Sequence, residues 1–134
     1  MPEDHVATVR SLYEAFGRGD VATIIDAVAD DIEWEAGATD HGLPLLSPGR
    51  GRTHVSAFFQ ELGALEFKRF EPRVLFGSGD HVMAVVAVEF LIPQTGRSVS
   101  EEGEGHLWTF GHDGKVVAFR HYVDTLQHQR AWSD

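Results

Sequence analysis

The spacing of apolar residues changes once along the chain, near residue 67, and this change limits the fold more than any other feature. Before that point, apolar residues recur every three or four positions, which is the spacing of one helix face. After it, they alternate with polar residues, which is the spacing of one strand face. Helices followed by consecutive strands are typical of an α+β fold, with helices laid on one face of an antiparallel sheet.

Three amphipathic helices are expected in the first part of the chain. The first covers Val6 to Phe16 and ends at the glycines that follow. Asp20 is suited to cap a second helix, which should end near Asp30. Apolar residues from Val55 to Leu62 predict the third. Proline and glycine between residues 36 and 52 indicate a loop that could cover a pocket.

A short strand is expected at residues 32–36, where apolar and acidic residues alternate. The carboxylates at positions 30, 31, 33 and 35 resemble a cation site. Alternation, however, turns Glu33 and Glu35 away from Trp34. We therefore interpret these acidic residues as a solvated edge.

Four longer strands are predicted after residue 67, separated by glycine-containing turns. They cover residues 70–76, 82–92, 99–110 and 116–123. Residues 126–132 are expected to form a short helix or a tail.

The amino-acid composition limits the classes of partner that the protein is expected to bind. Eleven basic residues against 21 acidic ones give a net charge of −10, which repels nucleic acids and anionic membranes. The chain has no cysteine, so disulfides and thiolate chemistry are excluded. We find no transmembrane or signal segment. These features predict one cytoplasmic domain over residues 1–134, with no nucleic-acid or membrane partner.

The strongest turn signal is Asp113-Gly114, which predicts a two-residue hairpin between the last two strands. This turn would place His112 opposite Lys115. The register then pairs the residues of one face as follows: His106 with His121, Trp108 with Phe119, Phe110 with Val117, and Glu104 with Val123. A one-residue bulge in the turn would instead send His106 and His121 to opposite sides.

With that register, two histidines and Glu104 share an aromatic face. Buried polar groups need partners, so packing alone does not explain them. Three interpretations remain open: hydrogen bonding within the core, a role in a pocket, or an exposed or interface face. Trp34, Trp108 and Tyr13 would line the same space, as ordinary core or as walls for a ligand.

The other polar residues are expected to have structural roles. Asp124 falls on the opposite face and should cap the C-terminal tail. The remaining histidines lie on expected helix surfaces, turns, loops or the tail, where solvated side chains are usual: His5, His41, His54, His81, His112 and His128.

Five segments make the chain resemble a known family. They are residues 13–20 (YEAFGRGD), 29–34 (ADDIEW), 49–52 (GRGR), 113–117 (DGKVV) and 119–124 (FRHYVD). Nearly the whole chain is similar to SnoaL-like proteins of the nuclear transport factor 2-like superfamily, which are related to ketosteroid isomerase and limonene epoxide hydrolase. The resemblance implies three helices on a strongly curved, mixed and mostly antiparallel sheet. This cone encloses an apolar pocket and commonly forms a homodimer.

The resemblance does not fix the reaction. The aspartate base of ketosteroid isomerases matches Ala36, and their oxyanion-hole acid matches His106. The arginine and two aspartates of limonene epoxide hydrolases match Glu104, His106 and His121, so that triad is absent. SnoaL-type polyketide cyclases are nearest, because a histidine matches His106. Their acid/base aspartate matches His121 or Asp124.

The residues and the resemblance together predict acid/base chemistry on a small apolar molecule, carbonyl-containing or polycyclic. His121 would be the base, His106 would hydrogen-bond or protonate a substrate oxygen, and Glu104 would orient one imidazole. The expected substrate-binding residues are Trp34, Trp108, Phe119, Tyr13 and Val123.

Two other functions are open. The fold could hold a ligand, or serve dimerisation, without catalysis. Alternatively, Glu104, His106 and His121 form a two-histidine, one-carboxylate set suited to iron(II) or zinc, although no metal or cofactor is expected from a recognised motif.

Overall fold

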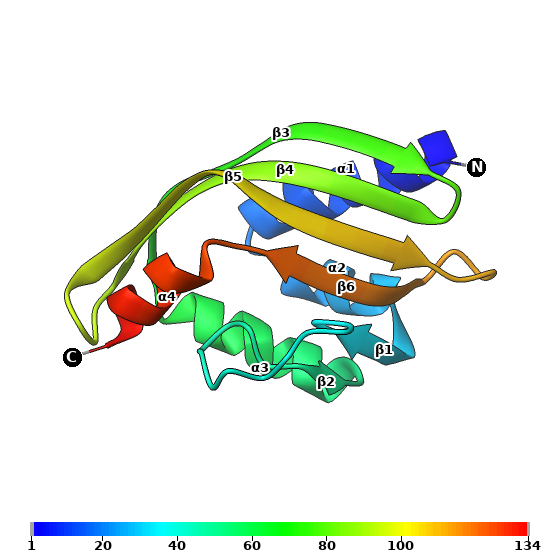
Figure 1. Cartoon of the computed structure of the whole chain (residues 1–134). Helices are drawn as coiled ribbons and strands as arrows, with labels where there is room; N and C mark the ends of the chain where they lie inside the picture. Colours follow the sequence, from blue (N-terminus) through cyan, green and yellow to red (C-terminus); the bar gives the residue numbers. More distant parts are fainter. Residues whose placement is uncertain (1, 134) are drawn as a thin grey trace.

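The computed structural model describes residues 2–133, and side chains from residue 4 to residue 133 (Figure 1). Two helices, two short strands and a third helix come first: α1 (Pro2–Gly17), α2 (Val21–Ala27), β1 (Val28–Trp34), β2 (Gly49–Arg50) and α3 (Arg52–Gly63). Four strands and a helix complete the described residues: β3 (Glu66–Ser78), β4 (His81–Ile92), β5 (Arg97–Phe110), β6 (Val116–Tyr122) and α4 (Thr125–Trp132). The expected α+β architecture is confirmed.

The strands form one mixed sheet in the order β2-β1-β6-β5-β4-β3. All neighbouring strands are antiparallel except β1 and β6, which are parallel. The sheet is strongly bent along β3, β4 and β5, and it is not closed (Figure 1). The parallel β1–β6 pair places Trp34, at the end of β1, beside Phe119 in the middle of β6.

The helices cover the concave side of the sheet. Helix α1 packs on β3 and β4, α3 packs on β1, and α4 packs on β5 (Figure 1). As expected, the Asp20 carboxylate caps α2 by accepting a hydrogen bond from the Thr23 backbone nitrogen. Asp124 caps α4 in the same way through Gln127, which confirms its structural role. None of the described helices is long and apolar enough to cross a membrane.

Several element boundaries differ from the expectation, and the strand expected at residues 32–36 instead covers Val28–Trp34. Helix α2 ends at Ala27 rather than near Asp30, because Val28 already adopts an extended backbone and pairs with Val116 of β6. The expected loop at residues 36–52 contains the two-residue strand β2, which pairs with the end of β1.

The β5–β6 hairpin has the expected pairing at its inner end and a different turn. His106 lies opposite His121, and Trp108 lies opposite Phe119. The predicted pairs of His112 with Lys115 and Phe110 with Val117 are wrong. The Gly111 nitrogen instead donates to the Lys115 carbonyl, and Phe110 lies opposite Val116.

A β-bulge explains why the inner register is nevertheless correct. The longer turn puts the strands out of the predicted register, and the pairing shifts by one residue between Phe110 and Thr109. Val117 is the additional residue on β6, and beyond it the register returns to the predicted one. As a result Val116, not Val117, is fully buried.

Candidate active site

A mainly apolar cavity of about 70 Å³ lies between the concave face of the sheet and helices α1, α2 and α3. Its walls include all five residues expected to bind substrate, Trp34, Trp108, Phe119, Tyr13 and Val123. Its polar lining includes Glu104, His106 and His121, together with His128. The cavity therefore brings together every residue singled out for chemistry.

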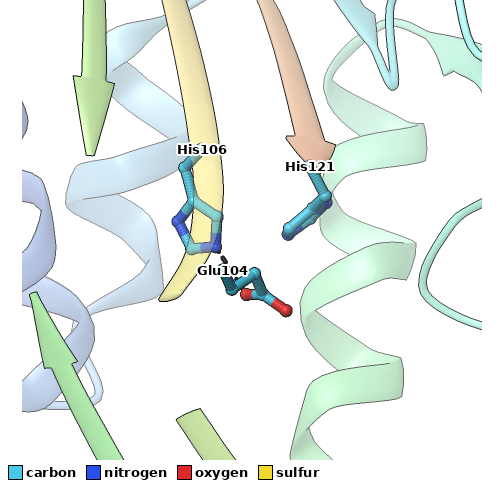
Figure 2. A group of neighbouring side chains, drawn as sticks. All are labelled: Glu104, His106 and His121. Carbon is cyan, nitrogen blue, oxygen red and sulfur yellow. Dashed lines mark hydrogen bonds and ion pairs between the residues drawn. The ribbon is translucent and has the colours of Figure 1, made fainter. Parts of the chain in front are cut away.

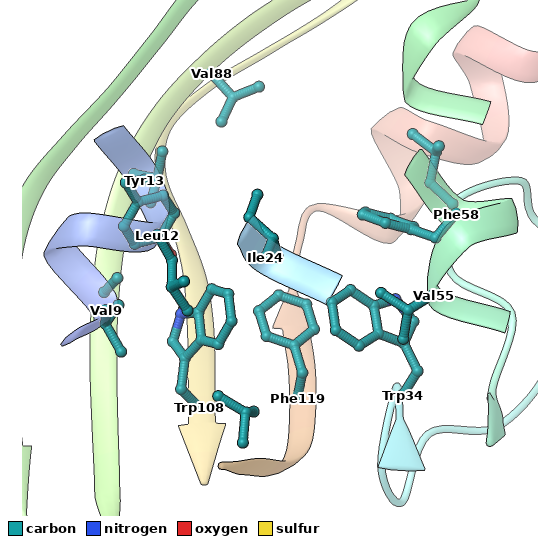
Figure 3. Close-up of a cluster of buried hydrophobic side chains, with 14 of the residues drawn as sticks. Val9, Leu12, Tyr13, Ile24, Trp34, Val55, Phe58, Val88, Trp108 and Phe119 are labelled. Atoms are coloured by element: carbon teal, nitrogen blue, oxygen red, sulfur yellow. The ribbon is translucent and has the colours of Figure 1, made fainter. Parts of the chain in front are cut away.

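Three aromatic rings form a continuous row along one wall of this cavity (Figure 3). Trp34 stacks on Phe119 with ring centroids 4.3 Å apart, and Trp108 meets Phe119 edge-on at 4.6 Å. Each ring comes from a different strand, so the order β1-β6-β5 creates the row. Such rings supply a large apolar surface with few rotatable bonds.

His121 is held by a carboxylate that sequence reasoning missed. Its Nδ1 is bonded to Oε1 of Glu35, and its backbone nitrogen donates to the same oxygen at 3.1 Å. Glu35 is 1% exposed. The expectation that Glu35 belongs to a solvated edge is therefore wrong, whereas Asp30 and Asp31 are exposed as expected.

The backbone at Glu35 explains the error. Glu35 has φ 55°, in the left-handed region that residues with a Cβ seldom adopt. This conformation breaks the strand alternation directly after Trp34, so both consecutive side chains are buried. Alternation alone predicts the opposite, and the only signal was an acidic residue at the end of a strand. Left-handed backbone in a non-glycine residue is found preferentially at functional sites.

His106 has both ring nitrogens engaged by protein groups. Nε2 lies 2.6 Å from Oε2 of Glu104, and Nδ1 lies 2.6 Å from the Tyr13 hydroxyl. The indole nitrogen of Trp108 donates to the same hydroxyl at 3.1 Å. Glu104 therefore orients an imidazole as predicted, and that imidazole is the one of His106.

This chain of hydrogen bonds fixes the tautomer of His106. The ionised Glu104 carboxylate can only accept, so Nε2 of His106 carries the hydrogen that is donated to it. In the neutral ring, Nδ1 then accepts from the Tyr13 hydroxyl, whose oxygen accepts from Trp108. Burial, helped by the nearby His121 imidazole, lowers the pKa of His106 below the ordinary value, which favours this neutral ring.

The pKa of His121 is shifted in the opposite direction. Burial alone would lower the pKa of His121, but the hydrogen bond and charge of Glu35 outweigh it and raise the pKa above its ordinary value. Burial would likewise raise the pKa of Glu104, and the hydrogen bond from His106 reverses this and lowers it. The pKa values of two neighbouring histidines are therefore shifted in opposite directions.

The two imidazoles meet nearly at right angles. Their centroids are 4.9 Å apart with an interplanar angle of 84°. Figure 2 shows one ring nitrogen of His121 turned toward His106 and Glu104. Because Nδ1 is bonded to Glu35, this nitrogen is Nε2, and within residues 2–133 no side chain hydrogen-bonds to it.

Among the side chains that the structure describes, two groups could ligate a metal ion. The first is Glu104, His106 and His121, whose candidate ligand atoms lie within 4.8 Å of one another. The second is Glu101, Glu104 and His128. His128 was expected to be solvated on the tail, and this is wrong: it lies on the inner face of α4 and is 2% exposed.

The SnoaL-like domain family model matches residues 9–119, and the chain belongs to this family. A search of curated proteins found no match.

Solved structures share the fold over nearly the full length. An NTF2-like protein from Burkholderia xenovorans has 27% identity and a TM-score of 0.85, covering 99% of this chain and 98% of that one. An LEH-like epoxide hydrolase from M. tuberculosis has 16% identity and a TM-score of 0.71, with coverages of 97% and 90%. A structure provisionally labelled a SnoaL-like polyketide cyclase, from Mesorhizobium loti, has 21% identity and a TM-score of 0.69, with coverages of 92% and 100%.

Proposed function

We propose that the protein is a small-molecule enzyme in which the Glu35–His121 dyad removes a proton from carbon next to a carbonyl group. One observation carries this proposal. The Nδ1 of His121 is fixed by a buried carboxylate, while Nε2 is unengaged and turned into the apolar cavity. A carboxylate that holds one imidazole nitrogen fixes the tautomer and stabilises the imidazolium that forms after proton transfer.

The electrostatics suit a base that works near neutral pH. Glu35 raises the pKa of His121, so its imidazolium is a more favourable product of proton transfer. His106, by contrast, stays neutral and keeps a hydrogen on Nε2, directed at Glu104. In the proposal, a substrate oxygen competes with Glu104 for this hydrogen.

The proposed step moves one proton from the substrate to His121 and back. The Cα–H proton of the substrate moves to Nε2 of His121, and the electron pair of that bond forms an enolate. The enolate oxygen accepts a hydrogen bond from Nε2 of His106. The imidazolium of His121 then returns its proton, either to the same carbon or to another, and the second outcome is an isomerisation. General base catalysis of this kind contributes about 10²–10⁴-fold to rate.

The substrate class follows from the walls of the cavity. Apolar and aromatic side chains surround the two histidines, so a compact, largely apolar carbonyl compound fits better than a charged one. Polyketide cyclase, epoxide hydrolase and isomerase labels among the similar structures support small-molecule chemistry in this fold.

Deuterium exchange tests the base without knowledge of the natural substrate. The bicyclic ketone 2-tetralone is incubated with the protein in deuterium oxide, and loss of its α-proton signals is followed by NMR. We expect exchange above the buffer rate, reduced about 10²–10⁴-fold in His121→Ala. His112→Ala, an exposed histidine of the β5–β6 turn, is the matched control. Unchanged exchange in His121→Ala would remove the dyad from the mechanism.

A non-catalytic ligand-binding domain is the second candidate function. It is favoured by the fact that both nitrogens of His106 are already satisfied within the protein. The same samples distinguish it, because 2-tetralone would then shift the indole signals of Trp34 and Trp108 without any protein-dependent exchange.

A further inference from the structure

A second polar cluster lies at the end of the cavity nearest α4, outside the Glu35–His121 dyad. It consists of Glu101 and Glu104 on β5 and His128 on α4. Their carboxylate oxygens and imidazole nitrogens include a set that lies within 4.8 Å of one another. The mechanism proposed above uses neither Glu101 nor His128.

A β-bulge brings the two glutamates together. Residues three apart on a regular strand point to opposite faces of the sheet. Here Glu104 pairs with Val86 and Glu101 pairs with Val88, so two residues of β5 lie opposite the single residue between them on β4. The bulge therefore turns Glu101 toward the same side as Glu104. Bulges are a recurrent means of re-aiming a side chain next to a site.

The cluster is buried, and it concentrates negative charge. The side chains of Glu101, Glu104 and His128 are 9%, 8% and 2% exposed, respectively. Burying two carboxylates in an apolar protein is costly unless a cation or hydrogen-bond donors compensate them. Glu104 receives one hydrogen bond from His106, and Glu101 receives one from the Asp124 backbone nitrogen at 3.2 Å.

Hydrogen bonding leaves this cluster incomplete within residues 2–133. Neither ring nitrogen of His128 has a hydrogen-bond partner, and neither has Oε1 of Glu101. Nε2 of His128 lies 3.2 Å from that oxygen, within ion-pair distance, but the two atoms lack the geometry of a hydrogen bond. This separation also fits two ligands of one cation. Ligands bound at about 2.0–2.1 Å in a tetrahedral site are about 3.3 Å apart.

We propose that Glu101, Glu104 and His128 bind a divalent transition-metal ion, with Zn²⁺ as the best fit. An imidazole with two carboxylates favours zinc over magnesium or calcium, which prefer oxygen-only ligands. Three protein ligands leave a fourth position open toward the cavity. The metal neutralises the two carboxylates, and it ties α4 to β5.

Metal binding is measured on the purified full chain after treatment with EDTA, by calorimetric titration with ZnSO₄. Co²⁺ absorption spectra report the ligand geometry. Glu101→Gln and His128→Asn each remove one ligand. Glu102→Gln is the matched control, because Glu102 adjoins Glu101 but is 71% exposed. His121→Asn removes a member of the other cluster and leaves this one intact.

We expect one Zn²⁺ per chain in the wild type, in Glu102→Gln and in His121→Asn. Loss of an indirect, outer-sphere partner already weakens metal sites about 10- to 100-fold, so loss of a ligand should weaken binding at least that much. The absence of stoichiometric binding in the wild type would overturn the proposal. Binding that survives Glu101→Gln and His128→Asn but is lost in His121→Asn would overturn it as well. Neither result bears on the dyad, whose deuterium exchange is measured separately.

Discussion

His106 and His121 face each other across β5 and β6 with ring centroids 4.9 Å apart, yet each is held by a different carboxylate. Glu104 holds His106 through Nε2, and Glu35 holds His121 through Nδ1. The free nitrogen of the pair therefore belongs to His121 alone. This asymmetry gives two identical side chains different chemistry.

The first prediction concerns the titration of the two imidazoles. NMR of the ring protons should show His121 titrating above the ordinary histidine pKa, and His106 below it, in keeping with the two opposite shifts. In Glu35→Gln, the carboxylate is gone and burial dominates, so the pKa of His121 should fall. An unaltered His121 titration in Glu35→Gln would contradict the proposed pairing.

The second prediction concerns stability against pH. A histidine with a raised folded-state pKa stabilises the fold fully below its unfolded pKa, and this contribution is lost as pH rises through the folded value. Glu35→Gln should therefore cost most stability at pH below about 6.5 and less at alkaline pH. Urea unfolding of both proteins across this range measures it. A difference that grows with rising pH would have the wrong sign.

The third prediction concerns Tyr13. Removing its hydroxyl in Tyr13→Phe leaves Trp108 Nε1 and His106 Nδ1 buried without this partner. We expect a loss of about 1–3 kcal/mol in unfolding free energy, measured by urea denaturation. Tyr122→Phe is the control, because Tyr122 is half exposed. Nitrogen NMR should also show that His106 keeps its hydrogen on Nε2 in this variant, because the Glu104 carboxylate still accepts it, and a hydrogen found on Nδ1 would contradict the assignment.

The fourth prediction concerns the loop that covers the cavity. A Cβ on Gly49 would lie 2.3 Å from the His54 ring, whose Nε2 is bonded to the Ser47 carbonyl at 2.8 Å. Gly49→Ala should displace that ring and loosen residues 36–48, and amide hydrogen exchange should increase there. Gly63→Ala meets nothing within 4 Å and is the control. Equal exchange in the two variants would show that the contact does not hold the loop.

The sequence predicted the fold well because periodicity reports which faces are buried. It predicted three helices and the long strands, and the turn signal at Asp113-Gly114 led to the correct pairing of His106 with His121. The turn itself was wrong, since the shift at Val117 compensates for a longer loop. The longer turn and the bulge cancel each other, so the alternation of apolar and polar residues farther along β5 and β6 is the same as for a two-residue turn without a bulge.

The carboxylates were harder to predict because both depend on local departures from regular strands. Glu35 is buried through one left-handed residue, and Glu101 is turned inward by a bulge. Alternation assigns such residues to the wrong face. His128 was missed for another reason: its burial depends on how α4 folds back on β5, a tertiary contact that helical spacing alone does not specify.

The bulge at Val117 also separates the turn of the β5–β6 hairpin from the end that carries His106 and His121. Because the pairing shift occurs next to the turn, the pairing of His106 with His121 is set by the strands deeper in the sheet and not by the turn. Changes of sequence or length at residues 111–115 should therefore leave the relative position of His106 and His121 unaltered.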